Sequence, residues 1–185
     1  MSTLFSKPGQ VNTDAALAIL REAIDQQASR QVVVASTHGD TGIKAARLLK
    51  GMGVTLVVVT HNAGFKEPGK VEMSPETRHQ LEGCGVKVLT GTMPFRNIGT
   101  AIREKQGYSQ QDLVANTLRL FGQGVKVCVE IALMASDAGL ITPDDVLTVA
   151  GTGRGADTVA LISPRPSNQL FDLKIREILA KPSTW

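Results

Sequence analysis

Residues 32–49 read VVVASTHGDTGIKAARLL and have the pattern of a strand, a turn and a helix in direct succession. The opening run of β-branched residues is typical of a strand buried on both faces, and the Ala- and Leu-rich part that follows has helical spacing. The turn between them is rich in small, hydroxyl-bearing and charged residues: Ser36, Thr37, His38, Gly39, Asp40, Thr41 and Gly42. Two interpretations fit this turn. It is either a capped turn and nothing more, or a pocket for an anion, most often a phosphate, at a helix start.

The rest of the chain repeats this alternation of strands and helices up to residue 150. Strands are expected at 54–60, 86–89, 146–150 and 158–163, and helices at 13–28 (capped by Thr13), 41–50, 75–83, from 109 onward and at 125–138. Only about seven residues separate the last two strands, too few for a crossover, so they should form an antiparallel hairpin. The fold class expected is therefore α/β, a three-layer α/β/α sandwich whose mostly parallel sheet ends in a C-terminal antiparallel hairpin.

Three segments give weaker signals. Residues 91–107 show little periodicity and predict one or two helical turns at most. The segment 125–138 is nearly all apolar, which indicates a buried helix or one that faces a partner subunit. The tail FDLKIREIL alternates at Phe171, Leu173 and Ile175 and fits an edge strand.

Composition limits the class of protein. The 185 residues are 42% hydrophobic and 20% charged, as expected for one globular α/β domain over residues 1–185. The net charge of +3 comes from scattered Lys and Arg, and only 4% of residues are aromatic, which argues against a nucleic-acid surface. Residues 1–12 lack a signal-peptide pattern, and no apolar run has the length of a membrane span, so we expect a cytoplasmic protein with no membrane contact. Cys84 and Cys128 are expected to be buried, reduced thiols.

Candidate binding residues follow three of the expected strands. Because ligands gather at the carboxyl ends of parallel strands, residues 36–42, 60–70 and 151–157 are expected to converge on one pocket. Beside the first turn, the candidates in the second and third segments are Thr60, His61, Asn62, Gly151, Thr152, Gly153, Arg154 and Gly155. The loop GTGRGA matches a dinucleotide fingerprint only formally, because a strand follows it instead of a helix. It is either a plain glycine-rich hairpin loop or a lid whose Arg154 reaches a phosphate.

His38 and His61 should lie at neighbouring positions, each directly after a strand. Without a third ligand they predict no metal site, and one or both are expected to line the pocket. His79 lies on a polar helix and is expected to be solvated. The residues show no nucleophile elbow, so the sequence assigns no catalytic residue.

These segments resemble the C-terminal α/β domain of pyruvate kinase, and more closely a small family of microbial proteins built from that domain alone. The resemblance rests on VVVASTHGDTGIKAARLL, VVVTHNAGF, VLTVAGTGRGADTVALI and the long segment LRLFGQGVKVCVEIALMASDAGLI. It implies that Ser36, Thr37, Gly39, Thr41 and Gly42 hold an effector phosphate and that the loop 151–155 closes over it. His38 and Asp40 depart from that pattern.

The resemblance implies no pyruvate kinase activity, because the catalytic centre of that family lies in a barrel domain with no counterpart here. The function expected is binding of a phosphorylated small molecule, either a sugar phosphate or a mononucleotide such as FMN with its ring against Phe65 or the glycine loop. The alternative is a small enzyme, FMN-dependent in one form, that uses His38 or His61 as acid–base groups. A homo-oligomer is also expected, since this domain lies at subunit contacts in the kinase.

Overall fold

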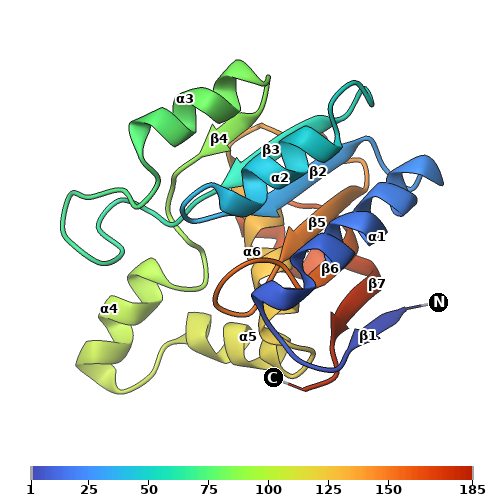
Figure 1. The fold of residues 1–185 in the computed structure, drawn as a ribbon. Coiled ribbons are helices and arrows are strands. Elements are labelled where there is room, and N and C mark those ends of the chain that lie inside the picture. The colour runs from blue at the N-terminus through green and yellow to red at the C-terminus, as the bar shows by residue number, and fades with distance from the viewer. Residues whose placement is uncertain (1, 185) are drawn as a thin grey trace.

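A single mixed sheet runs through the middle of the protein (Figure 1). The computed structural model describes residues 2–184, and within them the sheet has the strand order β1-β7-β6-β5-β2-β3-β4. The strands are β1 (Thr3–Phe5), β2 (Gln31–Ala35), β3 (Thr55–Val59), β4 (Lys87–Leu89), β5 (Val146–Ala150), β6 (Thr158–Ser163) and β7 (Lys174–Pro182). The strands β5, β2, β3 and β4 are parallel, whereas β6 is antiparallel to both β5 and β7. The expected α/β class and the C-terminal hairpin are confirmed.

The strand β2 lies at the centre and is buried on both faces, as its run of valines predicts. Val33 pairs with Val57 of β3 on one side and with Thr148 of β5 on the other. Its side chain packs in one hydrophobic cluster, while Val32 and Val34 pack in a second cluster across the sheet. A polar residue at any of these positions would leave an unpaired group between two packed layers.

Helices cover both faces of the sheet. They are α1 (Thr13–Asp25), α2 (Asp40–Leu48), α3 (Pro75–Gly83), α4 (Asn97–Gln106), α5 (Gln110–Arg119) and α6 (Gln123–Asp137), with 3-10 helices at Gln10–Asn12 and Ser167–Asp172. Apolar residues of α1, α2 and α3 pack in the cluster that contains Val32 and Val34, and those of α6, with Ala115 of α5, pack in the cluster that contains Val33. The parallel strands therefore end in an edge that is flanked by helices from both layers (Figure 1).

Two of the expected helix starts are confirmed and one is wrong. Ser74 accepts the Thr77 N–H at 3.2 Å, and Ser109 accepts the Asp112 N–H at 3.1 Å, as N-cap residues do. Thr13 is instead the first residue of α1, which ends at Asp25 and not at 28. Its hydroxyl cannot cap the helix because it donates to the carbonyl of Gln10 and accepts the N–H of Ala156.

The helix α4 is longer than the sequence predicts. It spans ten residues where one or two turns are expected, and only Gly99 among them is buried. Six of its ten residues are exposed and three more are half-buried. A helix that buries so little needs no apolar periodicity, which explains why residues 91–107 show little of it.

The C-terminal tail differs from the expected edge strand in two ways. Phe171 lies in a 3-10 helix with 86% of its surface exposed, so the alternation that included it does not belong to a strand. The strand β7 is internal, because β1 pairs with it in parallel and forms the edge itself. A three-residue strand near the N-terminus is too short to leave a pattern in the sequence.

The apolar helix α6 is buried within this chain. Eleven of its 15 residues are buried, and it packs against β5, β6 and α5. This confirms the buried-helix interpretation of residues 125–138 over the partner-facing one.

The two cysteines differ in burial. Cys128 on α6 is fully buried, and burial raises the pKa of its thiol to about 12. Cys84 is exposed at the end of α3, which corrects the expectation of two buried thiols. Over residues 2–184, the helices are all too short or too polar to cross a lipid bilayer.

Candidate functional site

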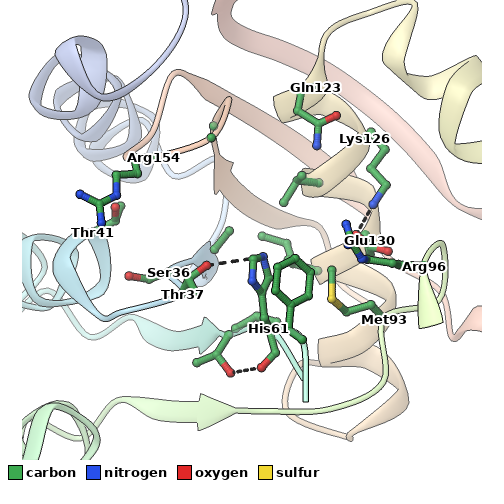
Figure 2. A pocket seen from close by; sticks show the side chains of 18 of the residues that line it. Ser36, Thr37, Thr41, His61, Met93, Arg96, Gln123, Lys126, Glu130 and Arg154 are labelled. Carbon is green, nitrogen blue, oxygen red and sulfur yellow. Dashed lines mark hydrogen bonds and ion pairs between the residues drawn. The ribbon is translucent and has the colours of Figure 1, made fainter. Parts of the chain in front are cut away.

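The three predicted segments do converge on one cavity of about 490 Å³ at the carboxyl ends of β2, β3 and β5 (Figure 2). This volume lies within the range of small-molecule sites. Eleven of the fifteen candidate residues line it: Ser36, Thr37, His38, Asp40, Thr41, Thr60, His61, Gly151, Gly153, Arg154 and Gly155. The cavity lining does not include Gly39, Gly42, Asn62 or Thr152.

The turn before α2 is shaped by two glycines that lie behind the cavity. Gly39, the N-cap residue, has φ +103°, and a Cβ there would lie 2.2 Å from Cγ2 of Thr77. A Cβ on Gly42 would lie 3.0 Å from a methyl of Val58, so this glycine lets α2 approach β3 closely. These two residues therefore position the turn without lining the cavity.

The start of α2 keeps its backbone donors free. Ser36 Oγ accepts the Gly42 N–H at 3.1 Å, and the Ile43 N–H bonds to the carbonyl of Gly39. Within residues 2–184 the protein supplies no acceptor for the backbone N–H groups of residues 37–41. Asp40 is the first residue of α2, its side chain is exposed, and it does not cap the helix. We call these five consecutive free donors, residues 37–41, the cradle. Free N–H groups at a helix start carry partial positive charge, which attracts anions in general.

Hydrogen bonds hold the glycine loop between β5 and β6 near the points where it leaves one strand and enters the next. Asp157, fully buried, accepts the Gly9 N–H at 2.7 Å and the Thr152 N–H at 3.0 Å through Oδ2. The Ala156 N–H bonds to the hydroxyl of Thr13. Gly153 and Arg154, at the tip, are exposed. Arg154 lies on the same side of the cavity as Thr41 (Figure 2).

His61, directly after β3, is half-buried in the wall of the cavity. Its Nε2 lies 3.5 Å from Thr37 Oγ1, and its Nδ1 lies 3.5 Å from Glu72 Oε2. Burial lowers the pKa of His61, the charge of Arg96 lowers it further, and Glu72 opposes both effects. The net direction is downward, so the imidazole is neutral near pH 7.

His38 and His61 both contact Glu72, His38 through the backbone and His61 through the side chain. His38 Nδ1 is 3.1 Å from the Glu72 carbonyl oxygen. Both histidines line the cavity, which confirms that expectation. His79 on α3 is exposed, also as expected. Nowhere in residues 2–184 do three or more His, Cys, Asp or Glu side chains gather in a way that could hold a metal ion.

Phe65 contacts one aromatic side chain, His61, and one cationic side chain, Arg96. The His61 ring stacks on it with a centroid distance of 3.7 Å, and the guanidinium carbon of Arg96 lies 4.3 Å from its centroid. A flat ligand can stack on Phe65 only by displacing one of these two neighbours.

The opposite wall of the cavity, from α4 to α6, was missed by the sequence reasoning. It contains a buried ion pair between Lys126 and Glu130, with Arg96 beside it (Figure 2). Glu130 also accepts the Phe95 N–H at 2.9 Å. Burial lowers the pKa of Lys126. The signal was present in the sequence, since two opposite charges four residues apart in a buried, apolar helix must pair with each other.

Cations outnumber acids around the cavity. Seven Lys and Arg residues line it, against three Asp and Glu residues. The cations are Lys44, Lys66, Arg96, Arg103, Arg119, Lys126 and Arg154. Cations that converge on a concave surface raise the local concentration of anions.

Fold and cavity together define an α/β protein with a cationic pocket at the carboxyl edge of its sheet. Over most of its length this chain is similar in fold to pyruvate kinase of Cryptosporidium parvum, with 16% identity, a TM-score of 0.44, and coverage of 86% of this chain and 24% of the kinase. The same kinase in complex with ADP gives 17% identity, a TM-score of 0.40, and coverage of 85% and 24%.

A third similar structure is O-ureido-L-serine synthase, with 17% identity, a TM-score of 0.34, and coverage of 76% of this chain and 51% of that chain. This chain thus spans about a quarter of the length of the pyruvate kinases it matches. No family model matches the chain.

Proposed function

We propose that this chain binds a phosphorylated small molecule, a sugar phosphate or a mononucleotide, with its phosphate against the start of α2. The observation that carries the proposal is the row of free backbone N–H groups at residues 37–41. Four of these five residues line the cavity: Thr37, His38, Asp40 and Thr41. Hydroxyl groups of Ser36, Thr37 and Thr41 add further donors in the same turn. This geometry is the one in which helix starts bind phosphate in other proteins.

The charges around the cavity favour a phosphate site over a capped turn that binds no ligand. Arg154 at the tip of the glycine loop supplies a planar guanidinium that suits phosphate oxygens. The excess of cations in the lining supports a ligand with more than one negative charge. Asp40 opposes such a ligand only weakly, because its exposed carboxylate is screened by solvent.

FMN is one mononucleotide of this class. It is also the cofactor that the alternative function, a flavin-dependent enzyme, would use. His38 and His61 in the cavity wall support that alternative, since both are placed to act on a ligand. Stacking of the flavin ring on Phe65 would require movement of Arg96 or His61. Flavin absorbance of the purified protein, or its appearance after addition of FMN and gel filtration, separates the flavin protein from one that binds only sugar phosphates.

A thermal-shift screen tests the proposed ligand class. The probes are inorganic phosphate, glucose 6-phosphate and FMN, and a specific ligand should raise the unfolding midpoint through mass action. Thr41→Glu places a carboxylate in the cradle and should abolish the shift. Because Thr41 is buried, Arg154→Ala at the exposed loop tip serves as a second variant, with exposed Arg47→Ala on α2 as its control. Equal shifts in wild type, Thr41→Glu and Arg154→Ala would contradict the proposal.

We also propose that the protein is a homo-oligomer, in which exposed apolar side chains of α5 and the residues after it contact a second copy. Leu113, Leu120 and Phe121 each expose more than half of their surface. Light scattering on wild type and on Leu113→Lys/Leu120→Lys tests this, and a monomeric wild-type protein would contradict it.

A further inference from the structure

Three side chains from separate segments lie in a row beside the cradle. Glu72 Oε2 is 3.5 Å from His61 Nδ1. His61 Nε2, on the far side of the ring, is 3.5 Å from Thr37 Oγ1 (Figure 2). The imidazole thus contacts a carboxylate through one nitrogen and a hydroxyl through the other. An acid, an imidazole and a hydroxyl in this order form the arrangement by which a histidine activates a nucleophile.

Part of this row is buried without hydrogen bonds. His61 Nδ1 and both Glu72 oxygens are buried, and within residues 2–184 they have no hydrogen-bond partner of good geometry. Lys66 Nζ approaches Glu72 Oε1 only to 3.7 Å. Buried polar atoms without partners are rare, and a catalytic role is one physical explanation for them. Catalytic hydrogen bonds are often long in the absence of substrate and shorten when it binds.

The charges that face His61 favour a neutral base. These are Glu72, Arg96 and Glu130, and together with burial they leave its pKa below the usual value. The Glu72 carboxylate favours the tautomer with the proton on Nδ1. Nε2 then carries a lone pair, and the Thr37 hydroxyl can donate to it.

We propose that Thr37, His61 and Glu72 form a hydrolytic relay, so that this pocket cleaves the phosphate monoester it binds. The inference rests on the proposed function, because the phosphate must occupy the cradle next to Thr37. Thr37 is the nucleophile, His61 the general base and acid, and Glu72 a positioning residue.

The reaction has two steps and consumes one water. In the first, Thr37 Oγ1 bonds to phosphorus while its proton passes to His61 Nε2, which keeps it. The bond from phosphorus to the alcohol oxygen, on the opposite side, breaks, and that oxygen takes a proton from solvent water. In the second, a water oxygen attacks the phosphothreonine from the side opposite Thr37 and gives up one proton to solvent, and His61 returns its proton to Thr37 Oγ1 as phosphate leaves. The backbone N–H groups of the cradle and Arg154 stabilise the charge on the phosphoryl oxygens during both steps.

Turnover of p-nitrophenyl phosphate and of glucose 6-phosphate by the full chain tests the relay. Thr37→Val and His61→Gln should each lower the rate at least about a hundredfold, the lower limit for loss of acid–base catalysis. Thr37→Ser should retain turnover, and His79→Gln, an exposed histidine on α3, should leave it unchanged. Intact mass after an acid quench should show one phosphoryl group on the wild type and none on Thr37→Val. Glu72→Gln should shift the pH–rate profile, which a purely structural role would not do.

These measurements distinguish a failure of the relay hypothesis from a failure of the proposed phosphate binding. Stabilisation of the wild type by inorganic phosphate or vanadate, together with no turnover, would overturn the relay and leave phosphate binding intact. No stabilisation and no turnover would overturn both. Turnover that survives Thr37→Val would overturn Thr37 as the nucleophile, and turnover that survives His61→Gln would overturn the relay as a whole.

Discussion

Lys126 and Glu130 form an ion pair one turn apart on α6, with only 5% and 2% of their side chains exposed. Glu130 uses its other oxygen to accept the backbone N–H of Phe95, which ties α6 to the segment before α4. Burial lowers the pKa of Lys126, Glu130 opposes this effect, and the positive charges of Arg119 and Arg96 lower the pKa further. The pair therefore sets the charge of one cavity wall and its shape at the same time.

We predict that breaking this pair destabilises the protein more than replacing it. Glu130→Gln leaves a buried ammonium without its partner and should cost about 3–5 kcal/mol of unfolding free energy. Lys126→Met leaves the buried carboxylate and should cost a similar amount. The double variant Lys126→Met/Glu130→Leu removes both charges, so it should be closer to wild type than either single variant. Urea denaturation of the four proteins measures this, and additive losses in the double variant would contradict it.

A second prediction concerns the pH dependence of stability through His61. Burial and Arg96 hold its pKa in the folded protein below the usual 6.5, despite the opposing charges of Glu72 and Glu130. Between these two pKa values the unfolded chain binds more protons at His61 than the folded chain does. The free energy of unfolding should therefore fall as pH drops from 6.5 through the lower folded pKa, and rise as pH increases through the same window.

The measurement compares wild type, His61→Gln and His79→Gln by urea denaturation between pH 7.5 and pH 5. His61→Gln should show a shallower loss of stability in this range than the other two proteins. A single histidine can change the folding equilibrium constant by at most about tenfold per pH unit. Parallel pH profiles for wild type and His61→Gln would contradict the prediction.

The sequence predicts the centre of the fold better than its edges. The continuous valines of β2 and the hydroxyl- and glycine-rich turn after it both carry strong local signals, because burial on two faces and a helix start each restrict the residue types. The strand β1 and the helix α4 carry no such signal. The first is three residues long, and the second buries only Gly99 among its ten residues.

The candidate site likewise contains residues that the sequence predicts and residues that it does not. Residues directly after strands could be assigned to the cavity, since the carboxyl ends of parallel strands meet at one edge. Glu72 and Arg96 could not, because each comes from a connecting segment whose path is set by tertiary packing. Their contacts with His61 and Phe65 arise only when the chain has folded.

The third prediction compares two glycines of the loop between β5 and β6. Both have positive φ, +78° at Gly153 and +70° at Gly155, so an alanine at either position should cost roughly 1–2 kcal/mol of backbone strain. At Gly153 a new Cβ has no neighbour within 4 Å. At Gly155 it would lie 2.4 Å from Thr13 Oγ1 and 2.6 Å from Gln10 Cα, and the second atom cannot move without shifting the backbone.

Gly155→Ala should therefore lose more stability than Gly153→Ala, by about a further 1–3 kcal/mol for the overpacked contact. It should also disturb the hydroxyl of Thr13, which accepts the Ala156 N–H at the base of the loop. Because Arg154 lies between these two glycines, Gly155→Ala should weaken the thermal shift that phosphate produces, while Gly153→Ala should weaken it less. Urea denaturation and the phosphate titration measure the two effects separately. Equal losses of stability in the two variants would show that strain alone, and not contact with residues 10 and 13, fixes this loop over the cavity.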